Sequence, residues 1–359
     1  MKKYLLLLTF LSIIGNAQIV RKYSNEFLNI GAGARGLAMG GAVISNQNDV
    51  YAPMWNPAGL TEVESDWQGA AMHAEYFESI AKYDYISFAK ALDSKDGVLG
   101  ISIVRLGVDN ILNTTQMIDS EGNIDYDKIS KFSTSDYAGI ISYAFRPGGN
   151  QKLSVGINAK IVYRNIGKFA NGFGFGFDAG AIYREDSGYQ FGAMLRDATT
   201  TVNFWSINQK ELSAVVNGEE FNPAPKDKME ITMPKLNLGV SKNFEINRDL
   251  ELLPEAGLNV DFAKTAAVIS TDFASISPYL GAELSFQKMI FVRAGLNRFQ
   301  TVTDIEDLKR KVSMQPSAGI GIKYKGLTLD YAITNTGIGG SNYFSNFFSL
   351  KLDMRDFRY

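Results

Sequence analysis

The chain has 359 residues, a formal net charge of −2 and no cysteine. This length allows one large domain or two ordinary ones. The near balance of charge gives no support for nucleic-acid binding, which needs a basic face. Without cysteine the chain has neither disulfides nor the residue at which a bacterial lipoprotein is acylated. A secreted form must therefore be stabilised by backbone pairing and packing.

The N-terminus has the three regions of an export signal. Lys2 and Lys3 supply positive charge, residues 4–14 are apolar, and Gly15-Asn16-Ala17 supplies small residues before a cleavage point. We predict a signal peptide over 1–17. A short membrane anchor is the alternative reading, but the apolar run is shorter than the ~20 residues that a membrane helix needs.

From about residue 65 onward, apolar residues tend to occupy every second position. In one segment Phe173, Phe175 and Phe177 alternate with Gly174 and Gly176. Side chains on a strand point to opposite faces in turn, so such a segment has one apolar face. The pattern predicts about fourteen strands, near 65–76, 83–91, 97–107, 135–146, 152–166, 174–185, 189–195, 235–244, 250–262, 277–286, 289–297, 315–324, 327–333 and 343–354.

The connections between these strands alternate in length. Short connections are expected at 93–96, 147–151, 186–188, 245–248, 287–288 and 325–326. Longer ones are expected at 108–134, 167–173, 196–234, 263–276, 298–314 and 334–342. Short turns at one end and long loops at the other are typical of an outer-membrane barrel with its turns in the periplasm. A soluble sandwich would alternate similarly, but a structureless 196–234 loop counts against it.

We therefore predict an all-β fold, an antiparallel transmembrane β-barrel of about fourteen strands over 65–359 in the outer membrane. An even strand number places both termini on the periplasmic side. Residues 18–64 do not read as strand and include a Gly- and Ala-rich run from Ile30 to Ala42. We expect this segment to fold into the barrel mouth as a plug, with Arg35 anchored to a carboxylate on the inner wall.

Three patterns could indicate other chemistry. Gly31 to Gly36 matches the spacing G-x-G-x-x-G, but a dinucleotide site would need a strand before it and a helix after it. His73 is the single histidine, so a serine or cysteine nucleophile would have to use it; we predict no enzyme and no cofactor. The acidic run from Asp119 to Asp127 is expected to be a solvated loop, with calcium binding left open.

The predicted strand at 97–107 alternates poorly. Both of its faces carry apolar residues, and Gly100, Arg105 and Gly107 interrupt the pattern. Glycine inside a strand permits bends. These three residues mark a candidate lateral opening in the wall, or an inner face suited to an apolar ligand.

Two segments carry a family resemblance. The run from Phe27 to Ala42 resembles the opening of PorV/PorQ-type proteins. The sequence Trp55-Asn56-Pro57-Ala58-Gly59-Leu60 is similar to the plug motif shared with long-chain fatty-acid (FadL-like) transporters of the outer membrane. The resemblance implies a fourteen-stranded barrel, an N-terminal plug and an opening in the wall. The motif residues it singles out are Arg35, Gly40, Asn56, Pro57 and Ala58.

For PorV-like members the resemblance implies a non-enzymatic component of the type IX secretion system. Its partners would be the translocon or attachment complex and the C-terminal domains of exported cargo. The run Ile30-Gly31-Ala32-Gly33-Ala34-Arg35 departs from PorV proper, so an accessory subunit of a related outer-membrane complex fits as well. The alternative is a FadL-like transporter of hydrophobic small molecules. Either way the barrel would contact outer-membrane lipid and no nucleic acid.

Overall fold

A computed structural model describes residues 24–63, 65–92, 97–119, 121–216, 219–221, 225, 228–303, 309–336 and 343–354. The predicted signal peptide at 1–17 and the predicted turn at 93–96 lie outside these residues.

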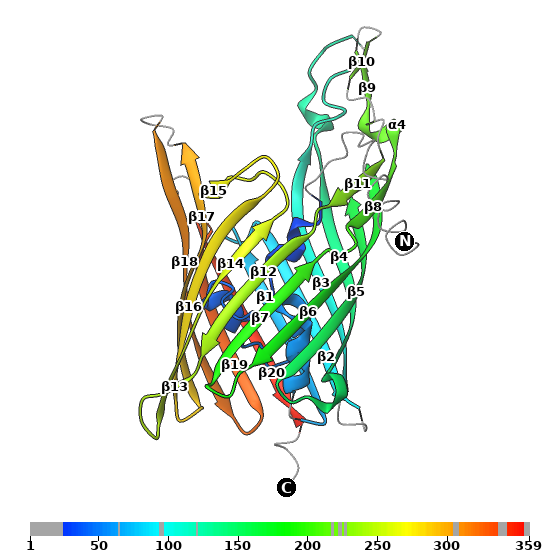
Figure 1. The fold of residues 1–359 in the computed structure, drawn as a ribbon. Coiled ribbons are helices and arrows are strands. Elements are labelled where there is room, and N and C mark those ends of the chain that lie inside the picture. The colour runs from blue at the N-terminus through cyan, green and yellow to red at the C-terminus, as the bar shows by residue number, and fades with distance from the viewer. Residues whose placement is uncertain are drawn as a thin grey trace.

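Fourteen strands of the described chain form one closed antiparallel barrel (Figure 1). They are β1 (Trp67–Tyr76), β2 (Ala81–Ala91), β3 (Gly97–Asn113), β4 (Ser130–Phe145), β5 (Leu153–Ile166), β6 (Ala170–Arg184), β7 (Tyr189–Arg196), β12 (Lys235–Lys242), β14 (Leu250–Asp261), β16 (Ser275–Phe286), β17 (Ile290–Thr303), β18 (Arg310–Tyr324), β19 (Leu327–Asn335) and β20 (Phe344–Asp353). Pairing of β20 with β1, from Gln68 with Asp353 to Glu75 with Asn346, closes the ring. The predicted fold class is confirmed.

Each barrel strand corresponds to one predicted segment, but several run further than the pattern indicated. β3 continues to Asn113, β4 begins at Ser130, β17 continues to Thr303 and β18 begins at Arg310. A strand needs only ~10 residues to cross a bilayer, so these strands extend beyond the apolar band that the alternation reports. The predicted long connection at 167–173 was wrong, because β5 ends at Ile166 and β6 begins at Ala170.

The predicted structureless loop at 196–234 was also wrong. It contains β8 (Thr201–Ile207), α4 (Gln209–Leu212), β9 (Ala214–Val216), β10 (Glu219–Phe221) and β11 (Met229–Thr232). β8 pairs with the first residues of β6, from Ala170 to Phe175, and β11 pairs with β8. The upper part of β6 would otherwise present an unpaired edge, and β8 and β11 cover it. Two shorter elements, β13 (Phe244–Glu245) and β15 (Ile269–Ser270), pair with β14 and β16.

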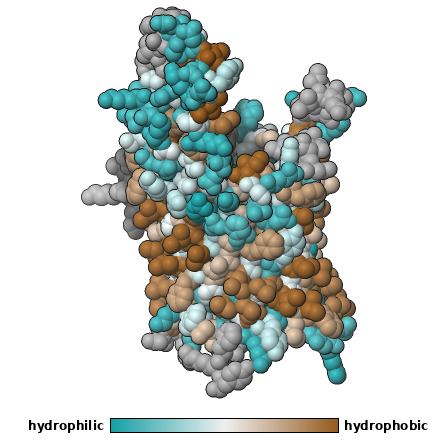
Figure 2. All heavy atoms as spheres, turned by 180° about the vertical axis from the view of Figure 1, so that it is seen from behind, coloured by the Kyte–Doolittle hydropathy of each residue, from teal (hydrophilic) through white to brown (hydrophobic). Residues whose placement is uncertain are grey.

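The outer face of the barrel is apolar and the inner face is polar or small. Phe173, Phe175, Ile320 and Ile322 are about half exposed on the outside. Figure 2 shows hydrophobic side chains gathered over the middle and lower part of the barrel, with hydrophilic ones on the tall end above it. This arrangement is the one that lipid contact requires.

Residues 24–63, which we call the plug, lie inside the barrel (Figure 1). The plug contains the 3-10 helices η2 (Glu26–Asn29) and η3 (Pro57–Glu62) and the short helices α2 (Ala34–Ala38) and α3 (Ala52–Trp55). Outside it, η4 (Tyr126–Lys128) and η5 (Pro147–Gly149) lie in connections. None of the helices in the described residues has the length and apolar composition needed to cross a membrane.

Glycines on the inner wall let the plug backbone lie directly against the strands. A Cβ at Gly281 of β16 would lie 2.3 Å from the Met39 carbonyl oxygen, and one at Gly295 of β17 would lie 2.1 Å from the Met39 carbonyl carbon. At Gly192 of β7 it would lie 2.3 Å from the Ile44 carbonyl oxygen. Only glycine leaves room for such close approach. Part of the high glycine content therefore serves plug–wall contact.

Candidate functional site

The glycine run of the plug wraps around one indole ring. Gly31 and Gly41 have φ of +86° and +82°, a conformation that glycine adopts without strain. A Cβ at Gly31 would lie 2.4 Å from the Trp55 ring, and one at Gly36 would lie 2.7 Å from it. Trp55 Nε1 donates a hydrogen bond of 2.6 Å to the Ala32 carbonyl oxygen. The G-x-G-x-x-G pattern thus packs on a tryptophan and does not form a strand–turn–helix nucleotide site.

Asn56 joins the plug to two strands of the wall. Its side chain is fully buried, and Nδ2 lies 2.9 Å from the Ile44 carbonyl oxygen, 3.1 Å from that of Ala181 and 3.3 Å from that of Ala193. Its Oδ1 accepts a hydrogen bond from the Ala58 amide, which caps η3. Pro57 suits the first position of this helix, where no amide donor is needed. On the far side of the lumen, the Gly40 carbonyl accepts from Asn297 Nδ2 at 2.9 Å.

Charged side chains of the wall hold the plug from inside. Arg35 Nε donates to Glu283 Oε2 at 2.9 Å, and its Nη2 donates to Asn46 at 2.7 Å. Glu283 also pairs with Arg293, and Arg293 pairs with Asp330. Breaking a buried pair by removing one partner typically costs about 3–5 kcal/mol. Side chains of three strands, β16, β17 and β19, thereby form the ion-pair network that holds α2.

A second carboxylate, Glu255 of β14, accepts four hydrogen bonds from the plug. The donors are the Ile44 and Ser45 amides at 2.7 and 3.0 Å, the Ser45 hydroxyl at 2.5 Å and Asn46 Nδ2 at 2.8 Å. Lys351 of β20 pairs with Asp49 at 3.1 Å. The sequence analysis missed these wall residues. Charged residues on the inward phase of predicted strands, as Arg293 is between Val292 and Ala294, were the available signal.

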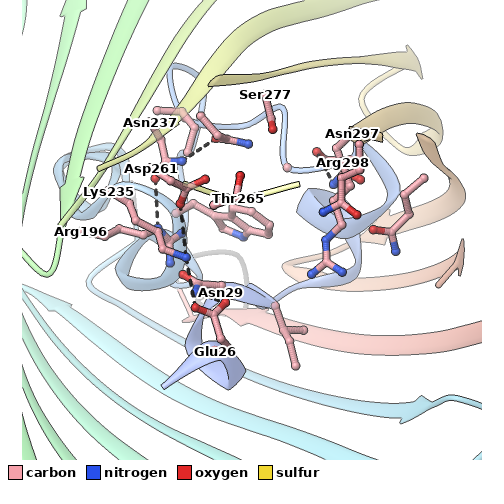
Figure 3. A pocket seen from close by; sticks show the side chains of 18 of the residues that line it. Glu26, Asn29, Arg196, Lys235, Asn237, Asp261, Thr265, Ser277, Asn297 and Arg298 are labelled. Carbon is pink, nitrogen blue, oxygen red and sulfur yellow. Dashed lines mark hydrogen bonds and ion pairs between the residues drawn. The ribbon is translucent and has the colours of Figure 1, made fainter. Parts of the chain in front are cut away.

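A cavity of about 380 Å³ lies in the lumen on the long-loop side of the plug (Figure 3). The plug supplies an apolar floor of Ile30, Leu37, Ile44 and Trp55 with the backbone at Gly40 and Gly41. The barrel supplies walls that are rich in amides, hydroxyls and charges. The cavity is thus amphipathic, and its volume falls within the ~300–1,000 Å³ of ligand pockets.

One side of the cavity has its polar groups paired with one another. Lys235 pairs with Glu26 at 3.3 Å and with Asp261 at 3.4 Å. Arg196 donates to the carbonyl oxygens of Leu28 and Met54 and to Asn237. Figure 3 shows Lys235, Arg196 and Asp261 together on this side, with Arg298 across the cavity. The paired side therefore has little capacity left for a ligand.

The residues of the candidate lateral opening lie in an unbroken part of the wall. β3 pairs with β2 from Val98 to Val108 and with β4 over the same stretch, and its register shifts only beyond Val108. Gly100 faces Leu60 of the plug, and Arg105 pairs with Asp84 at 3.1 Å. The ladder is continuous at Gly100, Arg105 and Gly107 in this conformation, so a lateral opening here stays a prediction.

His73 lies on β1 with its side chain half exposed. Its Nδ1 is 2.7 Å from Asp84 Oδ1, and Arg105 contacts the other oxygen of the same carboxylate. Among the described residues, Asp84 is the hydrogen-bond partner of the imidazole. In a hydrolytic triad the acid orients the histidine, and the histidine contacts a nucleophilic side chain. In the described part of the chain, His73 has the acid partner but no hydrogen bond to a nucleophile.

The acidic loop binds its own backbone. Asp119 Oδ1 accepts from the Glu121 and Asn123 amides at 2.9 Å, and Oδ2 accepts from Asn123 Nδ2 at 3.0 Å. The hydrogen bonds from Asn123 lower the pKa of the Asp119 carboxyl. In the part of the chain that the structure describes, no group of three or more His, Asp or Glu residues could hold a metal ion.

Comparisons with known proteins show the fold. Neither a family model nor a curated protein matches the sequence. The structure is similar to that of the CymD monoaromatic hydrocarbon channel, with a TM-score of 0.59 and 13% identity over 90% of this chain and 98% of that one. For the Ralstonia pickettii toluene transporter TbuX the TM-score is 0.56, with 13% identity over 90% and 98%. For a Pseudomonas aeruginosa FadL homologue it is 0.51, with 11% identity over 90% and 98%.

These neighbours, which are a hydrocarbon channel, a toluene transporter and a FadL homologue, share the barrel fold of this chain. At 11–13% identity the likeness extends to the fold alone. The alternative expectation of a FadL-like barrel gains support from it. PorV/PorQ membership and a role in type IX secretion gain none.

Proposed function

We propose that this chain is an outer-membrane channel for a small molecule that has an apolar portion. The observation that carries the proposal is the amphipathic cavity between the plug and the long loops. A molecule entering from the outside would rest its apolar part on Leu37 and Trp55. The structural neighbours, which are channels for hydrocarbons, support the same reading.

The plug must change its contacts for a molecule to leave the cavity toward the periplasm. It lies across the lumen and bonds to β6, β7, β14, β16 and β20. A ligand can shift such contacts only if it binds better to the arrangement in which they are broken. We propose that ligand on the cavity floor displaces part of the plug.

A disulfide between plug and wall tests this route. The hydroxyl oxygens of Ser45 and Ser241 lie 2.7 Å apart, and the chain has no native cysteine to compete. In a Gram-negative host without a channel of this kind, the S45C/S241C variant should lose most uptake of labelled aromatic hydrocarbons and aromatic acids when oxidised. A reductant should restore it, because the bond fixes the plug without filling the cavity.

The single variant S45C, which also loses the hydrogen bond to Glu255, is the matched control and should be unaffected by oxidant. Uptake no higher than in cells without the barrel, for every compound in the panel, would contradict the channel. Uptake that persists in the oxidised double variant would show that the plug need not move.

A further inference from the structure

Five side chains along one side of the cavity have polar groups without partners. They are Tyr76, Asn297, Arg298, Gln315 and Thr334, which we call the unpaired cluster. Asn297 Oδ1 and Thr334 Oγ1 are buried and form no hydrogen bond with any described residue. The side chains of Tyr76, Arg298 and Gln315 have neither a hydrogen bond nor an ion pair within the described chain. A buried polar group without a hydrogen-bond partner is unfavourable, so Asn297 Oδ1 and Thr334 Oγ1 call for a ligand or ordered water.

The strand register brings the cluster together. Asn297 of β17 is directly opposite Gln315 of β18, and Thr334 of β19 is opposite Ser317, two residues along from Gln315. The register of β17 shifts between Asn297 and Gln300, and Arg298 at this bulge has φ of +49°. Bulges re-aim side chains next to functional sites. Figure 3 shows Arg298 and Asn297 on the side of the cavity opposite Lys235.

Burial and pairing distinguish this side from the rest of the cavity. Gln315 is 8% exposed, and Tyr76 and Thr334 are each 7% exposed, yet all three line the open volume. The other basic residues of the cavity, Lys235 and Arg196, are already paired. Arg298 is exposed and unpaired among the described residues, so it is a cation available to a ligand at this side of the cavity.

The cluster requires both acceptors and donors from its ligand. Arg298 can only donate, and its charge favours an anionic oxygen. Asn297 Oδ1 can only accept, so it needs an N–H or O–H. Neither a hydrocarbon nor a simple carboxylate supplies both. We propose that the cavity binds a small organic acid that also carries a hydrogen-bond donor beside its carboxylate, with its apolar part on the plug floor. This inference rests on the proposed channel function and names its ligand class.

Binding to the purified barrel separates ligand class from transport. Four probes share one phenyl ring: mandelate (carboxylate and hydroxyl), phenylacetate (carboxylate alone), 2-phenylethanol (hydroxyl alone) and ethylbenzene (neither). Calorimetric titration in detergent micelles should rank mandelate first. Phenylacetate should bind about tenfold more weakly, because one hydrogen bond to a buried acceptor is lost. Ethylbenzene should bind most weakly.

Variants then assign the preference to the cluster. Arg298→Gln should weaken mandelate and phenylacetate about tenfold to a hundredfold and leave 2-phenylethanol nearly unchanged, since a charge-assisted bond is lost. Gln315→Leu should weaken all ligands with acceptors. Lys288→Gln, at a short turn on the other end of the barrel, is the matched loss of one positive charge and should change nothing.

The proposal is overturned if ethylbenzene binds as tightly as mandelate, or if Arg298→Gln leaves the affinity for mandelate unchanged. It is also overturned if none of the four binds. The uptake experiment with the disulfide-locked plug tests the channel function separately from the ligand class. If the binding results overturn the ligand class, uptake of hydrocarbons would still support the channel. If uptake fails, the channel function is wrong whatever the binding results are.

Discussion

At the residue scale, the side chains that hold the plug in place use nearly all of their hydrogen-bond donors and acceptors to do so. Glu255 gives both carboxylate oxygens to Ile44, Ser45 and Asn46, with one further weak contact from the Tyr279 hydroxyl at 3.4 Å. Asn56 uses its whole amide in the same way. A carboxylate that accepts from backbone amides both neutralises buried donors and fixes their position.

Glu255→Leu removes this acceptor and leaves the buried donors of residues 44–46 unpaired. Each unpaired donor costs about 1–3 kcal/mol, so we expect the plug to detach while the barrel ladder persists. Limited trypsin digestion should then cut at Arg35, whose side chain is 13% exposed in the native plug. Glu245→Leu, at an exposed turn, should leave Arg35 protected. Equal protection in both variants would show that Glu255 does not hold the plug.

At the element scale, β16, β17 and β18 have an apolar outer face, and their inward-facing positions next to the plug are glycines. Gly281 is directly opposite Gly295, and Gly319 of β18 is two residues from Ser317, the partner of Gly295. This row lets α2 approach the wall closely. β17 and β18 also carry Asn297, Arg298 and Gln315 of the unpaired cluster, so these two strands contribute both to plug contact and to the proposed ligand contacts.

Gly295→Ala tests this close contact. The added Cβ would lie 2.1 Å from the Met39 carbonyl carbon, and backbone cannot move aside as a flexible side chain could. We expect a folded barrel with a displaced plug, observed as faster trypsin cleavage at Arg35. Gly139→Ala on β4 is the matched control, because its Cβ would meet nothing within 4 Å. A protected plug in Gly295→Ala would mean that the wall yields instead.

At the scale of the whole molecule, the barrel has a short-turn end and a tall end. β4, β5, β6, β8 and β11 rise on one side of the tall end, and β17 and β18 rise on the other (Figure 1). The lumen cavity opens between the plug and this tall end. A transport route from outside to periplasm requires the tall end to face outward, as in outer-membrane barrels. We propose this orientation, with both termini in the periplasm.

Epitope tags decide the orientation. A tag inserted after Lys210, in α4 at the tall end, should bind antibody on intact cells. The same tag after Tyr359 should bind only after the outer membrane is permeabilised, because β20 runs toward the short-turn end. The opposite labelling pattern would invert the barrel and exclude uptake through the cavity as proposed.

The sequence by itself determined the barrel. Period-two alternation and the spacing of turns are local properties of the chain, and they located all fourteen strands of the described barrel within a few residues at most ends. Their outer ends were underestimated, because alternation reports contact with lipid and stops where a strand leaves the bilayer, as β3 does beyond Gly107. The 196–234 segment was misread for a related reason: β8 is ordered by the exposed edge of β6, which the segment's own residues do not reveal.

The site was decided by tertiary structure. Arg35, Asn56 and the glycine run could be singled out from sequence, but Glu283 and Ala181, the partners of Arg35 and Asn56, lie 248 and 125 residues away along the chain. Contact between the glycine run and Trp55 depends on how the plug itself folds. The residues of the unpaired cluster come from β1, the first barrel strand in the sequence, and from β17 to β19, which are among the last. They surround one cavity only because pairing of β20 with β1 closes the ring. Whether a polar group is paired or free depends on what surrounds it in space, which no local pattern records.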